Sequence, residues 1–299
     1  MKELLTMWKS TQMIVLTVLI AAVYAAVIVP FKAIPLVPGF TEIRVAPILI
    51  PAASLLFGPA AAWGAAVGNL IADLFGTFGP GSLVGFVGNF FFGAVPYVLW
   101  GRLGPLSSGE EPSMTSPRQI LEFCLLVGVA GLANAAILGW GLELLRFFPF
   151  TVLGTIVAIN NVLVPVLLGW LLLRLLYGRV SRMGLLWTDV MRPEEIGGGR
   201  SDGAASTGAR IGTHILALSG TAAMVVGALG GWFTGMALSL GAGGRLGLPG
   251  FGQTGGDTSV IAGVAPFMLL LLLALLLCRS RPELFGSGGS RAAPKGGSP

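Results

Sequence analysis

The feature that most constrains this chain is a series of apolar runs long enough to cross a lipid bilayer. A transmembrane helix needs about 20 mainly apolar residues, and the first run, 13–31, meets that length without a convincing signal-peptide cleavage site. Only 10% of the 299 residues are charged, against about 25% in an ordinary soluble domain. The runs also exceed the roughly 10 alternating residues of a barrel strand. The sequence therefore predicts an all-α polytopic membrane protein.

Eight spans are expected, of which the second and third are short and could instead form one re-entrant pair. The expected spans are 11–31, 45–56, 60–75, 82–100, 118–142, 149–177, 211–240 and 259–278. A stretch rich in Arg, Gly, Ser and acids separates the sixth span from the seventh, which is typical of a flexible linker. The predicted organisation is a six-span core (1–178), a cytoplasmic linker (179–210), a two-span C-terminal extension (211–278) and a disordered cytoplasmic tail (279–299).

The positive charges predict the orientation. With both ends of the chain in the cytoplasm, the inner segments carry 14 of the 18 Lys and Arg residues. The outer segments then carry only Lys32, Arg44, Arg146 and Arg245. Such an excess of inner positive charge is the usual arrangement in membrane proteins. We therefore expect a multi-pass protein of the plasma membrane with both termini inside.

Polar side chains recur within these apolar spans. An Asp or Arg at the bilayer centre costs about 2.5–3.5 kcal/mol on the insertion scale, so such groups usually face a cavity, a partner or a substrate. Asn69 and Asp73 lie four residues apart and share one helix face. With the predicted orientation, several segments bring polar groups to the outer half of the membrane. The candidate substrate-binding residues are Glu42, Arg44, Asn69, Asp73, Asn89, Asn134, Trp140, Asn160 and Asn161.

A simpler interpretation exists for each of these residues. An Asn in a membrane helix often only bonds a neighbouring helix, for about 0.6 kcal/mol. Glu42 and Arg44 could pair with each other, Asp73 could be solvated at an interface, and Trp140 could anchor its span at the membrane surface. As a set, the residues favour a small-molecule pocket.

The motifs of common enzymes are not found in the sequence. It contains no GxxxxGK[ST] phosphate-binding loop, no HExxH and no CxxC. Cys124 and Cys278 lie in separate apolar runs and indicate neither a disulfide framework nor a metal site. Ser82 is expected to cap its helix, far from the single histidine, His214. We therefore expect no enzyme, no catalytic residue, no metal and no cofactor.

The first span contains a stripe of small residues that would let another helix approach closely. The stripe consists of Ala21, Ala22, Ala25 and Ala26. Packing within the chain would use such a stripe equally well.

Taken with this stripe, the runs TEIRVAPILIP and FGPAAAWGAAVGNLIADLFG resemble the substrate-binding S component of energy-coupling factor (ECF) transporters, in its QueT-like branch. The resemblance covers about 11–177 and omits the last two spans. It implies binding of a vitamin-like micronutrient near the outer face under a lid formed by the first outer loop. It also implies that the alanine stripe contacts a transmembrane coupling subunit driven by two ATPases. The branch is associated with queuosine precursors.

Three functions remain open on these grounds. The favoured one is the substrate-capture subunit of an ATP-driven importer for a small heterocyclic vitamin or nucleobase-like compound. The second is a stand-alone secondary transporter or channel in which Asp73 carries a proton or cation. The third is a structural or assembly protein that uses its last two spans as a partner surface. Nucleic acid is not an expected partner, because the basic residues flank apolar spans.

Overall fold

The computed structural model describes residues 2–31, 35–37, 41–42, 45–192, 195–196, 207–242, 255–278 and 280–285. In chain order its elements are α1 (Glu3–Thr6), η1 (Met7–Lys9), α2 (Thr11–Phe31), β1 (Pro35–Val37), β2 (Thr41–Glu42), η2 (Ala46–Ile48), α3 (Leu49–Phe57), α4 (Pro59–Asp73), α5 (Pro80–Leu99), η3 (Gly104–Leu106), α6 (Pro117–Leu144), α7 (Phe150–Ala158), η4 (Ile159–Leu163), α8 (Val164–Arg182), α9 (Trp187–Val190), α10 (Thr207–Ala242), α11 (Thr258–Leu277) and η5 (Pro282–Leu284). Helices dominate, and β1 pairs with β2 in a short antiparallel hairpin.

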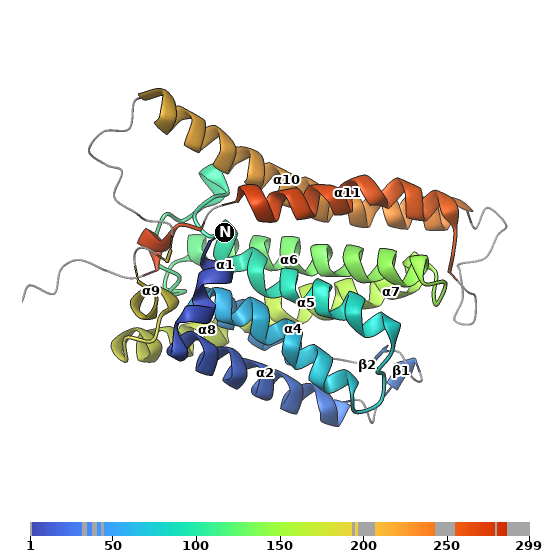
Figure 1. The fold of residues 1–299 in the computed structure, drawn as a ribbon, viewed down its shortest axis with the longest axis horizontal. Coiled ribbons are helices and arrows are strands. Elements are labelled where there is room, and N and C mark those ends of the chain that lie inside the picture. Colours follow the sequence, from blue (N-terminus) through green and yellow to red (C-terminus); the bar gives the residue numbers. More distant parts are fainter. Residues whose placement is uncertain are drawn as a thin grey trace, which may run out of the picture.

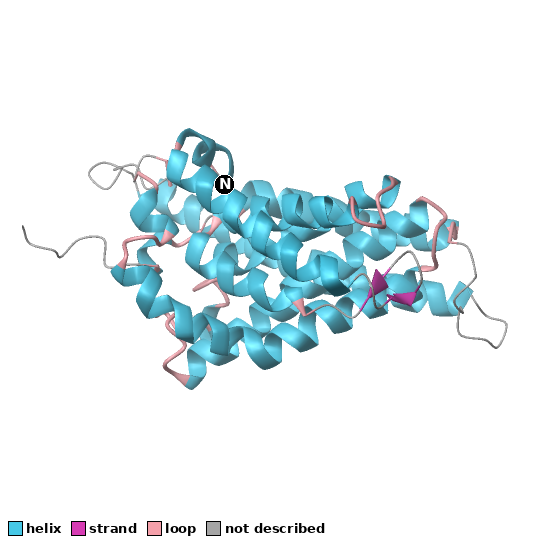
Figure 2. Ribbon diagram, turned by 90° about the horizontal axis from the view of Figure 1, so that it is seen from below, coloured by secondary structure: helices cyan, strands magenta, loops and turns pink. Residues whose placement is uncertain are grey.

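The long helices run roughly along one common axis (Figures 1 and 2). In the described part of the chain, six helical segments are long and apolar enough to cross a membrane. At the positions of the predicted second and third spans, α3 has nine residues and α4 has fifteen. The predicted fold class, an all-α polytopic membrane protein with a C-terminal pair of additional helices, is confirmed.

Glycines bring α2 and α4 into close contact. A Cβ atom added at Gly64 would lie 2.7 Å from the Ile20 side chain, and one at Gly68 would lie 2.7 Å from the carbonyl oxygen of Ala21. Gly64 and Gly68 are four residues apart and form a GxxxG ridge, which allows two helix backbones to approach. This packing positions α4, whose last turns carry Asn69 and Asp73.

The predicted sixth span is one continuous helical segment that runs through α7, η4 and α8. In η4 the backbone takes one π-helical turn, in which hydrogen bonds reach five residues back along the chain. The α7 half packs against α6 and α10, whereas the α8 half packs against α3 and α6. Asn160 and Asn161 lie within the π turn, and both are buried.

The C-terminal helices α10 and α11 pack against each other and against α6, and α10 also packs against α7 (Figure 1). The buried ring of Phe150 fits against glycine backbones on both sides, because a Cβ atom at Gly139 or Gly235 would collide with it. Trp232 on α10 donates its Nε1–H to the carbonyl oxygen of Gly154, at 3.1 Å. These contacts hold the last two helices against the core.

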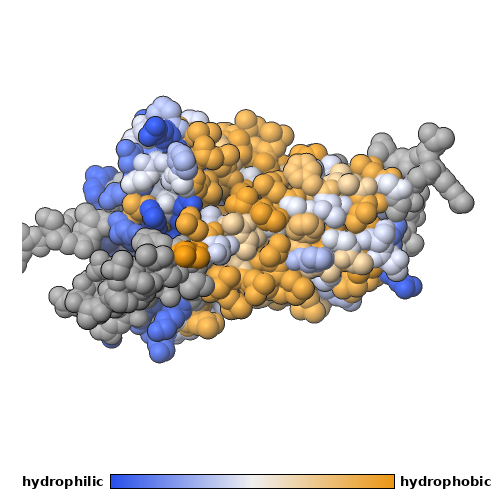
Figure 3. Space-filling model, turned by 90° about the horizontal axis from the view of Figure 1, so that it is seen from above, coloured by the Kyte–Doolittle hydropathy of each residue, from blue (hydrophilic) through white to orange (hydrophobic). Residues whose placement is uncertain are grey.

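The two ends of the bundle differ in polarity. Hydrophilic residues gather at the end where α1 and α9 lie, and hydrophobic residues cover the middle (Figures 1 and 3). At that end the buried Glu122 carboxylate accepts hydrogen bonds from Gly101 N and Ser108 N, both at 2.7 Å. The opposite end carries β1, β2 and the 74–79 turn, and we call it the hairpin end (Figure 1).

Candidate functional site

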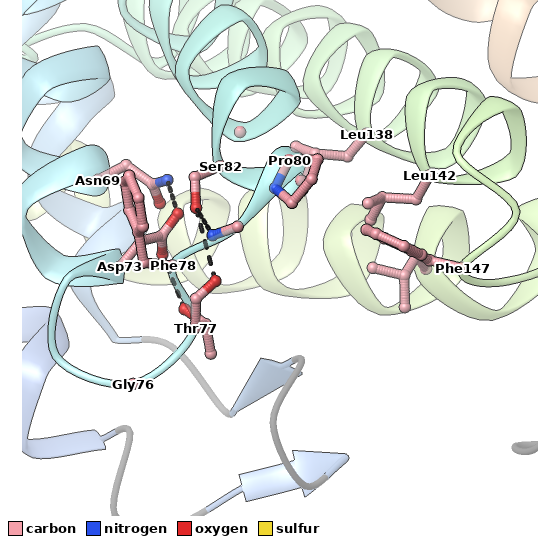
Figure 4. Close-up of a pocket in the computed structure, with 14 residues that line it drawn as sticks. Asn69, Asp73, Gly76, Thr77, Phe78, Pro80, Ser82, Leu138, Leu142 and Phe147 are labelled. Carbon is pink, nitrogen blue, oxygen red and sulfur yellow. Dashed lines mark hydrogen bonds between the residues drawn. The ribbon is translucent and has the colours of Figure 1, made fainter.

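A cavity of about 330 Å³ lies at the hairpin end, where the end of α4, the 74–79 turn and the start of α5 meet α6 and α7. Small-molecule sites typically measure about 300–1,000 Å³, so this volume suits a compact ligand. Fourteen residues line it: Asn69, Asp73, Gly76, Thr77, Phe78, Gly79, Pro80, Gly81, Ser82, Gly85, Leu138, Leu142, Phe147 and Leu153 (Figure 4).

One wall of the cavity is polar. The Asp73 carboxylate accepts a hydrogen bond from Asn69 Nδ2 at 3.3 Å and another from Thr77 Oγ1 at 3.1 Å. Ser82 Oγ accepts from Gly79 N at 3.3 Å, which closes the first turn of α5 (Figure 4). Asp73 is only 7% exposed, so these hydrogen bonds offset part of the cost of removing a carboxylate from water.

The opposite wall is apolar. Leu138 and Leu142 project from α6, and Phe147 follows from the next turn (Figure 4). Leu153 of α7 also lines the cavity. Gly85 leaves room between the walls, because a Cβ atom there would lie 3.0 Å from Asn69 Nδ2. Carboxylate, amide and hydroxyl groups that face an apolar wall suit a flat ligand with several N–H donors.

Of the nine predicted site residues, Asn69 and Asp73 line the cavity. Asn89 does not line it and lies further along α5. Its Oδ1 accepts from Tyr24 Oη at 3.0 Å, and its Nδ2 donates to the Gly85 carbonyl oxygen at 2.9 Å. The bond to Tyr24 ties α5 to α2, which is the role of an Asn that only bonds a neighbouring helix.

Asn134, Asn160, Asn161 and Trp140 also lie outside the cavity lining. Asn134 is buried between α5 and α6, where a Cβ atom at Gly88 would collide with its Oδ1. Trp140 donates its Nε1–H to the Ile261 carbonyl oxygen of α11, at 2.9 Å. This bond joins the Trp140 indole to α11, and the substrate-binding role of Trp140 stays a prediction.

The first outer loop lies largely outside the described residues. Arg44 is not described, and Glu42 is described only as backbone in β2. The hairpin itself lies at the same end of the bundle as the cavity (Figure 1).

The four alanines of α2 do not share one free surface. Ala21 and Ala25 are buried, and Ala21 touches the backbone of α4 at Gly68. Ala22 and Ala26 are exposed. Packing within the chain thus uses one pair, and only the other pair is available to a partner helix.

Sequence reasoning missed Thr77 as a site residue and assigned Ser82 to helix capping alone. Thr77 lies in a turn four residues after Asp73, a spacing that could have identified it. Ser82 combines a capping bond with a place in the cavity lining. Among the described residues, no group of three His, Cys, Asp or Glu side chains could hold a metal ion.

The apolar helices define the chain as a multi-pass membrane protein, and it carries a cavity at one end. The profile of the family described as QueT transporter matches residues 14–178. The chain belongs to this family, whose members are S components of ECF transporters. Comparisons with curated proteins and with solved structures gave no match.

Proposed function

We propose that this protein is the substrate-capture subunit of an ATP-driven, ECF-type importer, and that it binds a small heterocyclic vitamin or nucleobase-like compound in the cavity at the hairpin end. The observation that carries the proposal is the pairing of Asn69 and Asp73 on one wall with an apolar wall opposite. A planar heterocycle would place its N–H groups on the Asp73 carboxylate and its ring between the walls.

The distribution of charge supports an opening on the outer face. Most Lys and Arg residues lie in segments at the α1 and α9 end or in the predicted cytoplasmic linker and tail. By the positive-inside rule that end faces the cytoplasm, and the cavity then faces outward. The β1–β2 hairpin, which is part of the first outer loop, is the proposed lid.

Each predicted segment of the chain has a proposed role. Residues 1–178 would form the substrate-binding core, 179–210 the cytoplasmic linker, 211–278 the two-span extension and 279–299 the tail. Because the sequence lacks a phosphate-binding loop, energy would come from ATPase subunits through a coupling subunit. Ala22 and Ala26, on the exposed face of α2, are the proposed contact for that subunit.

Native mass spectrometry of gently purified protein tests the ligand proposal. A retained small molecule should be lost in Asn69→Ala and Asp73→Asn. Binding of 7-deazaguanine, chosen as a planar nucleobase-like compound with several N–H donors, should weaken in the same two variants.

Glu110→Gln is the matched control, since Glu110 accepts from Gln119 Nε2 at 3.0 Å and from Ser116 Oγ at 3.4 Å, away from the cavity. Equal binding by wild type and Asp73→Asn would refute the site. Ion-driven uptake by liposomes that contain only this protein would refute the importer-subunit role and favour a secondary transporter.

A further inference from the structure

The end of α6 and the start of α11 meet at one buried carboxylate. Glu143, in the last turn of α6, is 2% exposed. Its Oε1 accepts hydrogen bonds from Gly256 N at 2.7 Å and Asp257 N at 2.8 Å, and its Oε2 accepts one from Phe150 N at 2.5 Å. One side chain therefore joins the end of α6, the start of α7 and the segment that leads into α11.

The backbones on both sides of Glu143 fit closely together. A Cβ atom at Gly255 would collide with the Phe148 carbonyl oxygen and lie 3.1 Å from Glu143 Cα. Arg146, just after the C-cap of α6, has a φ of 60°, a left-handed conformation that glycine most often adopts. Its side chain lies over Gly256, where an added Cβ atom would be 3.0 Å from Arg146 Cγ. We call this contact between residues 143–150 and 255–257 the clasp.

The clasp also borders the cavity. Leu142 and Phe147 line the apolar wall, and they flank the turn that Glu143 holds. Phe147 N donates to the Leu142 carbonyl oxygen at 2.9 Å, which closes the turn between them. Leu153 follows on α7, whose first N–H group, at Phe150, is the one bonded to Glu143. A shift at Glu143 would therefore move the apolar wall.

The segment 255–257 lies beyond the stretch that matches the family. We propose that Glu143 is a positioning residue through which the C-terminal extension holds the apolar wall of the cavity in its ligand-binding geometry. This inference rests on the proposed function of the cavity. A buried carboxylate with three backbone donors is costly to disturb, because the buried Phe150 N–H would lose its partner and the two partly buried donors would lose theirs.

Glu143→Gln tests the clasp from the core side. The amide has one acceptor oxygen, so its NH₂ group must face a backbone N–H of either Phe150 or the 256–257 segment. Gly255→Ala tests the clasp from the extension side. In both variants of the full-length protein, hydrogen exchange of the 145–150 amides should rise, and 7-deazaguanine should bind about tenfold more weakly.

Two controls separate positioning from general destabilisation. Glu122→Gln changes an equally buried carboxylate on the same helix, bonded to loop amides at the opposite end. Gly241→Ala adds a methyl group to α10 where no atom lies within 4 Å. Both controls should keep the wild-type affinity, whatever their thermal stability.

The inference is overturned if exchange at 145–150 is unchanged, if exchange rises while affinity stays the same, or if Glu122→Gln weakens binding equally. If wild type fails to bind 7-deazaguanine, the proposed ligand class is refuted. In that case the exchange result alone decides whether Glu143 holds the cavity wall.

Discussion

Replacing Gly68 with alanine should force α2 and α4 apart. The added Cβ atom would lie 2.7 Å from the Ala21 carbonyl oxygen and 3.0 Å from Ala21 Cα. Both are backbone atoms, so no side-chain rotation relieves the contact. Overpacking of this kind costs about 1–3 kcal/mol. Alanine also raises helix propensity by about 1 kcal/mol relative to glycine, which masks part of the cost.

Gly128→Ala removes this ambiguity. Gly128 lies within α6, and no atom lies within 4 Å of an added Cβ. Both variants gain the same helix propensity, so the difference between their unfolding temperatures reports the cost of overpacking alone. At roughly 2–4 °C per kcal/mol, thermal unfolding in one detergent should place Gly68→Ala about 2–12 °C below Gly128→Ala. Equal unfolding temperatures would refute the close α2–α4 packing.

Three further outcomes are expected. Ala22→Leu should reduce co-purification of the proposed coupling subunit and ATPases without lowering the unfolding temperature, because Ala22 is exposed; unchanged recovery would exclude this contact. Tyr24→Phe should cost about 1–3 kcal/mol, seen in thermal unfolding, because Asn89 Oδ1 loses its buried donor. Hydrogen bonds from the Ser259 hydroxyl and N–H lower the pKa of the Asp257 carboxyl. The stability that ionised Asp257 adds to the folded protein is therefore complete above about pH 4 and is lost as the pH falls through the folded-state pKa. Asp257→Asn should abolish that acid-dependent loss in unfolding measured against pH.

The structure places several helices where the sequence predicts them. The predicted first span, 11–31, matches α2, and the predicted fifth span, 118–142, lies within α6. Long apolar runs bounded by Pro, Gly or charges leave little freedom, since a backbone in lipid must satisfy its own hydrogen bonds. The same reasoning marked the second and third spans as short.

The site was only partly predictable. Asn69 and Asp73 were found together because residues four apart share a helix face. Asn89 and Asn134 have the same chemistry, but helix packing turns them toward Tyr24 and Gly88. Hydropathy does not encode that rotation about the helix axis. The apolar wall could not be predicted, because the sequence pattern does not distinguish leucines that line a cavity from leucines that face lipid.

The π turn at 159–163 affects how one membrane span packs against two different sets of helices. Each residue inserted into a helix rotates everything after it by about 100°. The π turn instead takes up an extra residue within one wider turn, so α7 contacts α10 and α8 contacts α3 on either side of it. If all of these residues took regular α-helical geometry, the α8 surface would rotate by about 100° off α3, so the wider turn lets this length of chain pack against both neighbours.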